Sequence, residues 1–150
     1  PRLSALAGAG KYDEMWHELR HLLVLVVAAG GLAVVGFGFL GPFVVETAFG
    51  SGFAVSSRDM ALLAVSSAGL MVALTFAQAL IACRAQGRMA LSWVVGVVTF
   101  PIAVSFGSDL FLRVEVALIV SVVVSAILMA LMFERRIRGE GVAIRKNGSG

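Results

Sequence analysis

Four long stretches of the chain carry no charged side chain, and each is long enough to cross a lipid bilayer as a helix. They cover residues 22–45, 60–83, 89–108 and 116–133. A membrane-spanning helix needs about 20 mostly apolar residues to cross roughly 30 Å of hydrocarbon. Hydrophobic residues make up 59% of the 150-residue chain and charged residues 14%, whereas soluble domains average about 45–50% and about 25%. The sequence therefore predicts an all-α, polytopic membrane protein with four transmembrane helices.

The basic residues between these stretches predict how the helices are oriented. Three Lys or Arg residues precede the first stretch, the next three connections hold one, two and one, and five follow the last stretch. Because cytoplasmic connections carry the excess of Lys and Arg, we expect both termini and the connection with Arg84 and Arg88 in the cytoplasm. This bias explains the net charge of +3, so the charge gives no reason to expect a nucleic-acid partner.

The segments around the spans divide the expected chain into three parts, residues 1–21, 22–133 and 134–150. In the first part, Met15, Trp16 and Leu19 recur at helical spacing in a polar segment, which is typical of a short amphipathic helix on the cytoplasmic membrane surface. The last part is a basic cytoplasmic tail. Residues 41–59 mix glycine and phenylalanine, and they predict an outer loop with a half-helix or re-entrant turn.

Small residues recur every four positions in two spans, a pattern that lets membrane helices approach closely. They are Gly69 and Ala73 in the second span and Ala117, Ser121 and Ser125 in the fourth. The first span is rich in glycine. We interpret these residues as helix-packing faces. The fourth-span stripe and the first-span glycines are also candidates for a face that meets helices outside this chain.

Five polar residues are candidates for a cavity wall or an external or cytoplasmic loop site: Gln78, Glu46, Arg58, Arg84 and Arg88. Gln78 lies inside the second span and predicts either an interhelical hydrogen bond or a polar cavity wall. Glu46 is either a solvated interfacial charge or a site at the outer face. The three arginines flank the spans, and Arg88 is expected to determine topology.

The four spans contain no Asp, Glu, Lys, Arg or His. Intramembrane ionisable groups mark proton and ion pathways, so we do not expect these four helices alone to form a proton-coupled pump. His17 and His21 are four residues apart without a third ligand, and Cys83 is the single cysteine, so neither predicts a metal site. Because no nucleophile or phosphate-binding motif is present, we expect neither enzyme activity nor a cofactor.

Three segments occur in a recognisable order. Residues 1–27, PRLSALAGAGKYDEMWHELRHLLVLVV, lead from a polar stretch into a membrane helix; residues 40–53 pair Gly41-Pro42 with FGSGF; residues 77–88 carry Gln78 and Gly87-Arg88. In this order they resemble the polysaccharide-export flippases, the oligosaccharide-lipid and polysaccharide branch of the multidrug/oligosaccharidyl-lipid/polysaccharide exporter superfamily. The resemblance covers residues 1 to about 138.

The resemblance implies that the chain corresponds to the last four helices of the second lobe of a longer transporter, which agrees with a chain beginning at Pro1 without Met. The complete protein would move a lipid-linked oligosaccharide or polysaccharide precursor across the bacterial plasma membrane by alternating access. Its partners would be the lipid bilayer, the remaining helices and the lipid-linked glycan. Such proteins hold the anionic headgroup in a cationic cavity, so the resemblance implies that the cations come from helices outside this chain.

Two other functions fit four spans. A small multidrug exporter needs a membrane-embedded carboxylate in its first helix, and residues 22–45 contain none. A non-transporting membrane subunit would use its small-residue stripes to pack against partner proteins.

Overall fold

The structure, a computed structural model, describes residues 2–50, 52, 56–106 and 110–147, and this part of the chain contains five helices and no strand. The helices are α1 (Arg2–Gly8), α2 (Tyr12–Phe49), α3 (Ser57–Ala82), α4 (Gln86–Val104) and α5 (Leu110–Asn147). Four of them, α2 to α5, are long and apolar enough to span a membrane. The predicted all-helical chain with four membrane-spanning helices is therefore confirmed at this level.

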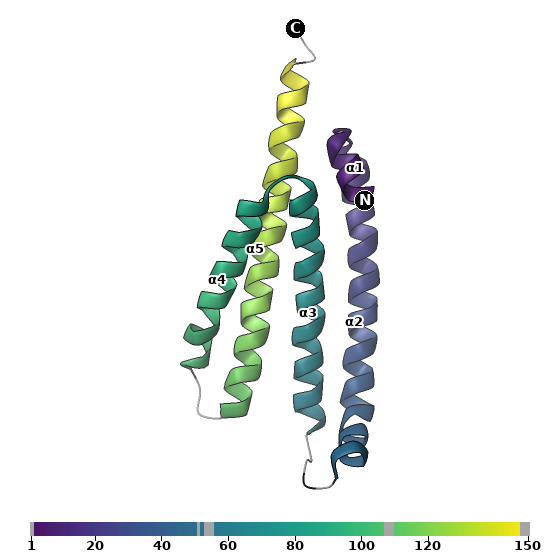
Figure 1. Ribbon diagram of the computed structural model, residues 1–150, viewed down its shortest axis with the longest axis vertical. Helices are drawn as coiled ribbons and strands as arrows, with labels where there is room; N and C mark the ends of the chain where they lie inside the picture. Colours follow the sequence, from purple (N-terminus) through teal and green to yellow (C-terminus); the bar gives the residue numbers. More distant parts are fainter. Residues whose placement is uncertain (1, 51, 53–55, 107–109, 148–150) are drawn as a thin grey trace.

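The four long helices form a row in the order α2, α3, α5, α4 (Figure 1). α3 packs against both α2 and α5, and α4 packs mainly against α5. α1, the α3–α4 turn and the end of α5 lie at one end of the row, which we call the terminal end. The end of α2, the start of α3, the end of α4 and the start of α5 lie at the opposite end. Because successive helices alternate in direction, both chain termini lie at the terminal end.

Most helices extend beyond the apolar stretches that predicted them. α2 and α5 are each 38 residues long, and they enclose the predicted spans 22–45 and 116–133. Glu, Lys and Arg are good helix formers, so a helix can continue after its apolar run ends. The predicted basic tail 134–150 is accordingly helical as far as Asn147. α4 differs, since it ends at Val104, before the predicted end of the third span at residue 108.

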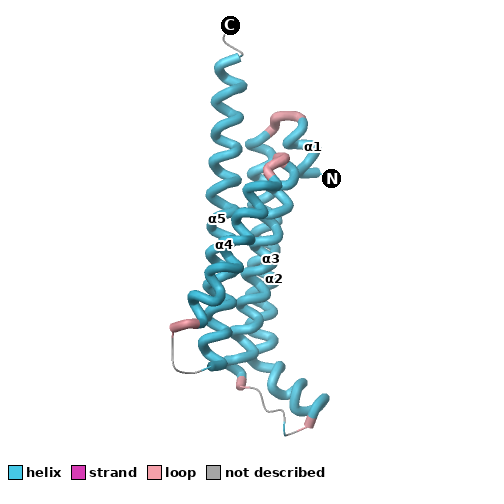
Figure 2. The backbone as a smooth tube through the Cα atoms, turned by 60° about the vertical axis from the view of Figure 1, so that its left-hand side comes forward, coloured by secondary structure: helices cyan, strands magenta, loops and turns pink. Residues whose placement is uncertain are grey.

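The expectation that a loop opens at Gly41 is wrong, because α2 continues through Pro42 to Phe49. Proline lacks the amide N–H, so it bends a helix by removing one backbone hydrogen bond. The last part of α2 turns away from the axis of the preceding part (Figure 2). The helix ends at Gly50, whose φ of 89° is unfavourable for residues with a side chain. Of the predicted outer-loop motif, residues 51 and 53 lie outside the described residues.

The polar segment expected as a separate surface helix forms the first turns of α2. The helix break lies earlier, at Gly10, whose φ is 68°. Gly10 N–H donates to Ala7 O, and Lys11 N–H donates to Leu6 O at 3.0 Å. This pair of bonds is the Schellman motif that ends a helix on a left-handed residue. The expected boundary between residues 21 and 22 therefore falls inside a continuous helix.

The most buried side chains gather at the terminal end. α2 contributes Met15 and Leu19, and α5 contributes Met129 and Phe133, all four fully buried. The other members come from the end of α3 and the turn that follows: Phe76, Ala77, Ala79, Leu80, Cys83 and Ala85. We call these ten residues the terminal cluster. It joins the start of α2 to α3 and α5, so the first turns of α2 are part of the packed bundle.

Candidate functional site

α4 and α5 meet at Gly96, where the absence of a side chain makes room for Ser125. A Cβ atom at Gly96 would lie 1.8 Å from Ser125 Oγ and 3.1 Å from Ser121 O. Ser121 Oγ donates to Gly96 O at 2.7 Å, and Ser125 Oγ donates to Ser121 O at 3.0 Å. Ala117, lower on the same stripe, is fully buried. The stripe of Ala117, Ser121 and Ser125 thus lies inside the chain's own packing, and the expectation that it meets helices outside the chain is wrong.

Small residues also line the contacts of α3 with its two neighbours. A Cβ atom at Gly69 would lie 3.1 Å from Val122 Cγ1 of α5, and Ala73, one turn along α3, is fully buried. On the other side, a Cβ atom at Gly30 of α2 would lie 2.7 Å from Ala68 Cβ. These positions place the helix backbones close together, as expected for membrane helices that pack without a hydrophobic driving force.

A groove follows the α2–α3 contact. One hollow of about 420 Å³ has walls from both helices: Ala29, Gly30, Ala33, Phe37, Met60, Leu63, Ala64, Ser67, Ala68 and Met71. A second hollow of about 280 Å³ shares Ala33, Phe37 and Met60 with the first and continues toward Val45. Ser67 Oγ donates to Leu63 O within α3 at 2.9 Å, so its hydroxyl is satisfied by its own helix. The α2–α3 groove is therefore an apolar surface with several small residues.

The predicted polar candidates do not converge on one site. Gln78 is exposed on α3 between the buried residues Ala77 and Ala79, and it does not belong to the wall of the α2–α3 groove. Glu46 is exposed near the end of α2, at the opposite end of the row from the α3–α4 turn. Gln78 and Glu46 therefore do not contribute to a common binding site.

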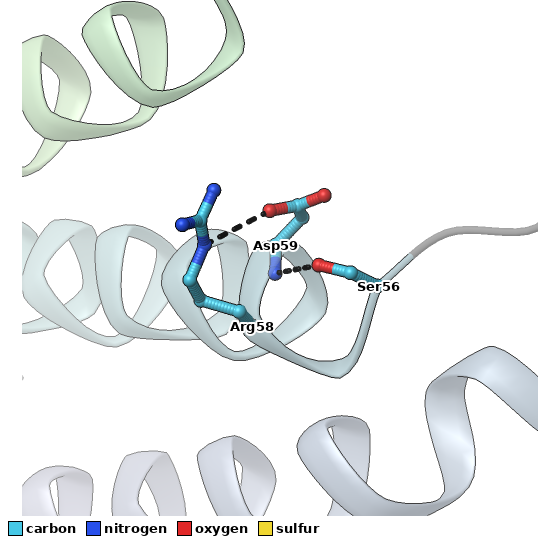
Figure 3. Close-up of polar contacts among 3 residues, drawn as sticks. All are labelled: Ser56, Arg58 and Asp59. Atoms are coloured by element: carbon cyan, nitrogen blue, oxygen red, sulfur yellow. Dashed lines mark hydrogen bonds and ion pairs between the residues drawn. The ribbon is translucent and has the colours of Figure 1, made fainter. Parts of the chain in front are cut away.

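Arg58 lies in the first turn of α3, at the opposite end (Figure 3). Its Nε donates to Asp59 Oδ1 at 3.4 Å. Asp59 N–H in turn donates to Ser56 Oγ at 3.1 Å, which is the side-chain cap expected at a helix start. Asp59 also suits the positive end of the helix dipole. The described contacts of Arg58 are those of a capped helix start.

Arg84 and Arg88 flank the α3–α4 turn and are both exposed. Arg84 has a φ of 54°, in the left-handed region. Its N–H donates to Ile81 O, and Ala85 N–H donates to Leu80 O at 2.9 Å. This is the same Schellman motif as at Gly10, here with an arginine where glycine is preferred. The turn holds both arginines at the surface of the terminal end.

Arg113 and Glu115 fall between the predicted spans 89–108 and 116–133, and so in a predicted connection, but both lie inside α5. Arg113 Nε donates to Val104 O at 2.7 Å, and Arg113 Nη2 donates to the same oxygen. Val104 is the last residue of α4, where helix carbonyls lack an intrahelical partner and carry partial negative charge. Glu115 is buried, with 6% of its surface exposed. The sequence signal that could have placed them is the apolar character of their neighbours Leu110, Leu112 and Val114, which extends the fourth apolar run toward residue 110.

Two pairs of aromatic rings lie close together at the terminal end. Trp16 stacks on Phe133 with ring centroids 5.9 Å apart, and it remains 45% exposed. The His17 and His21 rings are 6.2 Å apart and tilted. The described residues contain no group of three or more His, Cys, Asp or Glu side chains that could hold a metal ion.

Cys83 follows the last residue of α3 and is buried in the terminal cluster. Burial raises the pKa of its thiol, and the positive charge of Arg136 lowers it in part. A buried thiol in apolar surroundings is a poor nucleophile because little of it is ionised.

The chain thus combines a packed terminal cluster with an open apolar groove along α2 and α3. Comparison with protein-family models, curated proteins and solved structures finds no match to this chain.

Proposed function

We propose that this chain is the C-terminal part of a membrane exporter that moves a lipid-linked oligosaccharide or polysaccharide precursor across the bacterial plasma membrane by alternating access. The observation that carries the proposal is the open α2–α3 groove, with small residues from both helices in its walls. The ordered segments that resemble the polysaccharide-export flippases support the same function.

The side chains along the groove indicate what covers it. Bulky side chains such as Leu32 and Phe39, 75% and 82% exposed, are suited to lipid tails. The groove instead presents Ala29 and Ala33 beside small residues of α3 such as Ser67. Small residues on a membrane helix allow a second helix to approach closely. A further transmembrane helix is therefore the expected occupant, as in a larger lobe of which these four helices are one part.

The orientation follows from the unequal distribution of basic residues. Both termini and the α3–α4 turn lie at the terminal end, and this end carries most of the Lys and Arg residues of the chain. By the positive-inside rule, the terminal end faces the cytoplasm. The start of α2, with Trp16 and Leu19, then lies at the cytoplasmic membrane surface.

The chemistry of the groove walls indicates which helices of the proposed exporter bind the headgroup and which only pack. A lipid-linked glycan carries an anionic diphosphate, which needs cationic or hydrogen-bonding groups. The α2–α3 groove is apolar, so it does not suit that headgroup. In the proposed exporter these helices form a packing wall that moves as a unit, and other helices bind the headgroup.

Transport by the protein expressed from its native reading frame tests the proposal. The protein is reconstituted into vesicles with a fluorescent lipid-linked oligosaccharide, and an impermeant quencher reports which leaflet holds the label. We expect exchange between leaflets faster than in protein-free vesicles. A folded protein that moves no lipid-linked glycan, or a reading frame limited to these four spans, would contradict the proposal and favour the non-transporting subunit.

A pair of matched variants tests the role of the groove in transport. Ala33→Phe fills the groove, whereas Leu32→Phe changes a neighbouring residue that is 75% exposed. We expect Ala33→Phe to reduce transport strongly and Leu32→Phe to leave it near the parent rate, with both proteins folded by circular dichroism. Equal transport by the two variants would show that no helix needs the groove.

A further inference from the structure

We propose that four exposed arginines at the terminal end, Arg20, Arg84, Arg88 and Arg135, form a binding surface for the phosphate groups of anionic phospholipids. We call these four residues the arginine ring. They come from four different helices or turns, and all four are exposed. The inference concerns the surrounding bilayer lipid, so it is independent of what the protein transports.

The terminal cluster places the backbones of these arginines at the same end of the molecule. Arg20 follows Leu19, a buried member of the cluster, and Arg84 lies between the members Cys83 and Ala85. Arg135 comes two residues after Phe133, also a member, and Arg88 N–H donates to Ala85 O at 3.0 Å. Because the cluster is packed, the backbones that carry the four arginines are held next to it.

Other arginines at both ends of the row are engaged by the chain itself, and at the terminal end Arg138 pairs with Glu134. At the opposite end, Arg58 pairs with Asp59, and Arg113 donates to Val104 O. Among the residues that the structure describes, no ion pair or side-chain hydrogen bond engages Arg20, Arg84, Arg88 or Arg135. The arginine ring therefore has its guanidinium donors available to an external anion.

Two further features place the membrane surface near the arginines of the terminal end. Trp16 stacks on Phe133 and stays 45% exposed, and tryptophan is enriched where lipid headgroups begin. Asp13 and Glu14 precede Trp16 in α2, so they lie farther from the spans than Arg20 does, while Glu18 lies between Trp16 and Arg20. Lys11 offsets Glu14 through an ion pair at 2.7 Å. Arg20 thus lies between the first apolar span and the Asp13–Glu14 pair.

Phosphate is the chemistry that such a surface fits. Guanidinium groups donate paired hydrogen bonds to phosphate oxygens and remain charged at any physiological pH. A basic residue near an anionic membrane surface contributes attraction that corresponds to roughly fivefold in binding. Four exposed arginines at the terminal end would therefore enrich anionic lipid there over zwitterionic lipid.

Quenching of Trp16 by brominated lipids measures this preference. The chain has two tryptophans, so Trp93→Phe leaves Trp16 as the single reporter beside the ring. The full chain is reconstituted with phosphatidylcholine and either phosphatidylglycerol or phosphatidylcholine brominated near the headgroup. We expect brominated phosphatidylglycerol to quench Trp16 with at least a fivefold higher apparent affinity. Equal quenching by the two lipids would overturn the proposal.

Variants and a free anion separate the ring from general charge effects. We expect Arg20→Gln, Arg88→Gln and Arg135→Gln together to remove most of the preference, while Arg84 stays because it shapes the turn. Arg58→Gln, at the opposite end, should leave the preference unchanged, with folding checked by circular dichroism. A preference retained in the triple variant would contradict the ring. Loss of the preference in inorganic phosphate, but not in chloride of equal ionic strength, would instead identify a site for free phosphate.

Discussion

Gly96 of α4 and Ser125 of α5 share a space that holds only one side chain: a Cβ atom on Gly96 would lie 1.8 Å from Ser125 Oγ. The hydroxyl of Ser121, one turn away, donates to Gly96 O across the same contact at 2.7 Å. Two small residues and the Ser121–Gly96 hydrogen bond thus join α4 to α5 at this point, and Arg113 of α5 donates to Val104 O at the end of α4. α4 has few contacts with α3, so this seam determines where α4 lies.

Gly96→Ala is expected to destabilise the protein by about 1–3 kcal/mol, because the added methyl group overlaps Ser125 Oγ and approaches Ser121 O. Thermal unfolding in detergent measures the change. Gly31→Ala is the matched control, since nothing lies within 4 Å of its added Cβ atom. Ser125→Ala in the Gly96→Ala background should recover part of the loss. An equal melting temperature for Gly96→Ala and Gly31→Ala would disprove the close contact.

Ser121→Ala removes the interhelical hydrogen bond and is expected to cost about 0.6 kcal/mol, a typical value for such bonds between membrane helices. Ser66→Ala serves as the control because Ser66 Oγ donates to Leu63 O inside α3. Chemical unfolding in mixed micelles compares the two variants. A larger loss for Ser66→Ala than for Ser121→Ala would contradict the assignment.

Arg84→Gly is expected to stabilise the α3–α4 turn by about 1 kcal/mol, since glycine adopts a left-handed φ without the steric penalty that a side chain brings. The φ of Arg84 is 54°. The reciprocal change, Gly10→Ala, should destabilise the α1–α2 turn by a similar amount, because Gly10 has a φ of 68°. Melting temperatures that shift in the same direction for both variants would argue against the two left-handed turns.

Leu19→Ala is expected to cost about 2–5 kcal/mol, the range for removing a large buried side chain, because Leu19 is fully buried in the terminal cluster. Leu25→Ala, two turns farther along α2, is the control, since Leu25 is 64% exposed. Unfolding is followed by circular dichroism in detergent. If Leu19→Ala unfolds like the parent protein, the first turns of α2 do not belong to the packed bundle.

Cys83 is expected to react slowly with a maleimide at neutral pH, because it is buried and its raised pKa keeps the thiol protonated. The rate should rise with pH as the thiolate fraction grows. Gln86→Cys in a Cys83→Ser background provides an exposed reference at the first residue of α4. Phe133→Ala, which opens the cluster, should accelerate labelling of Cys83. Labelling of Cys83 as fast as the reference would contradict its burial.

The spans and their alternation could be predicted from the sequence because they depend on local composition. A run without charges identifies a helix that can enter lipid, where every backbone polar group must be satisfied within the segment. The ends of the helices could not be predicted in the same way. Pro42 was expected to open a loop, yet α2 continues to Phe49, since neighbouring residues supply enough helical hydrogen bonds to tolerate a bend.

The surroundings of single residues were harder to predict. Met15 and Leu19 were assigned to a surface helix, but their side chains are fully buried. Arg113 was assigned to a connection, but it donates to Val104 O of α4. In both cases the helical spacing could be read from the sequence, but the partner helix could not. A helical period shows which residues share a face, and it does not show which helix that face contacts.

The sequence by itself determined that the chain forms four apolar helices joined by connections of alternating basic content, because hydrophobic run length and charge are properties of adjacent residues. Only the tertiary structure decided that the order in space is α2, α3, α5, α4, that Ser121 bonds to Gly96, 25 residues away in the chain, and that an α2–α3 groove stays open. The physical reason is that glycine, alanine and serine permit close contact without selecting a partner. The partner is selected by the packing of all the helices together.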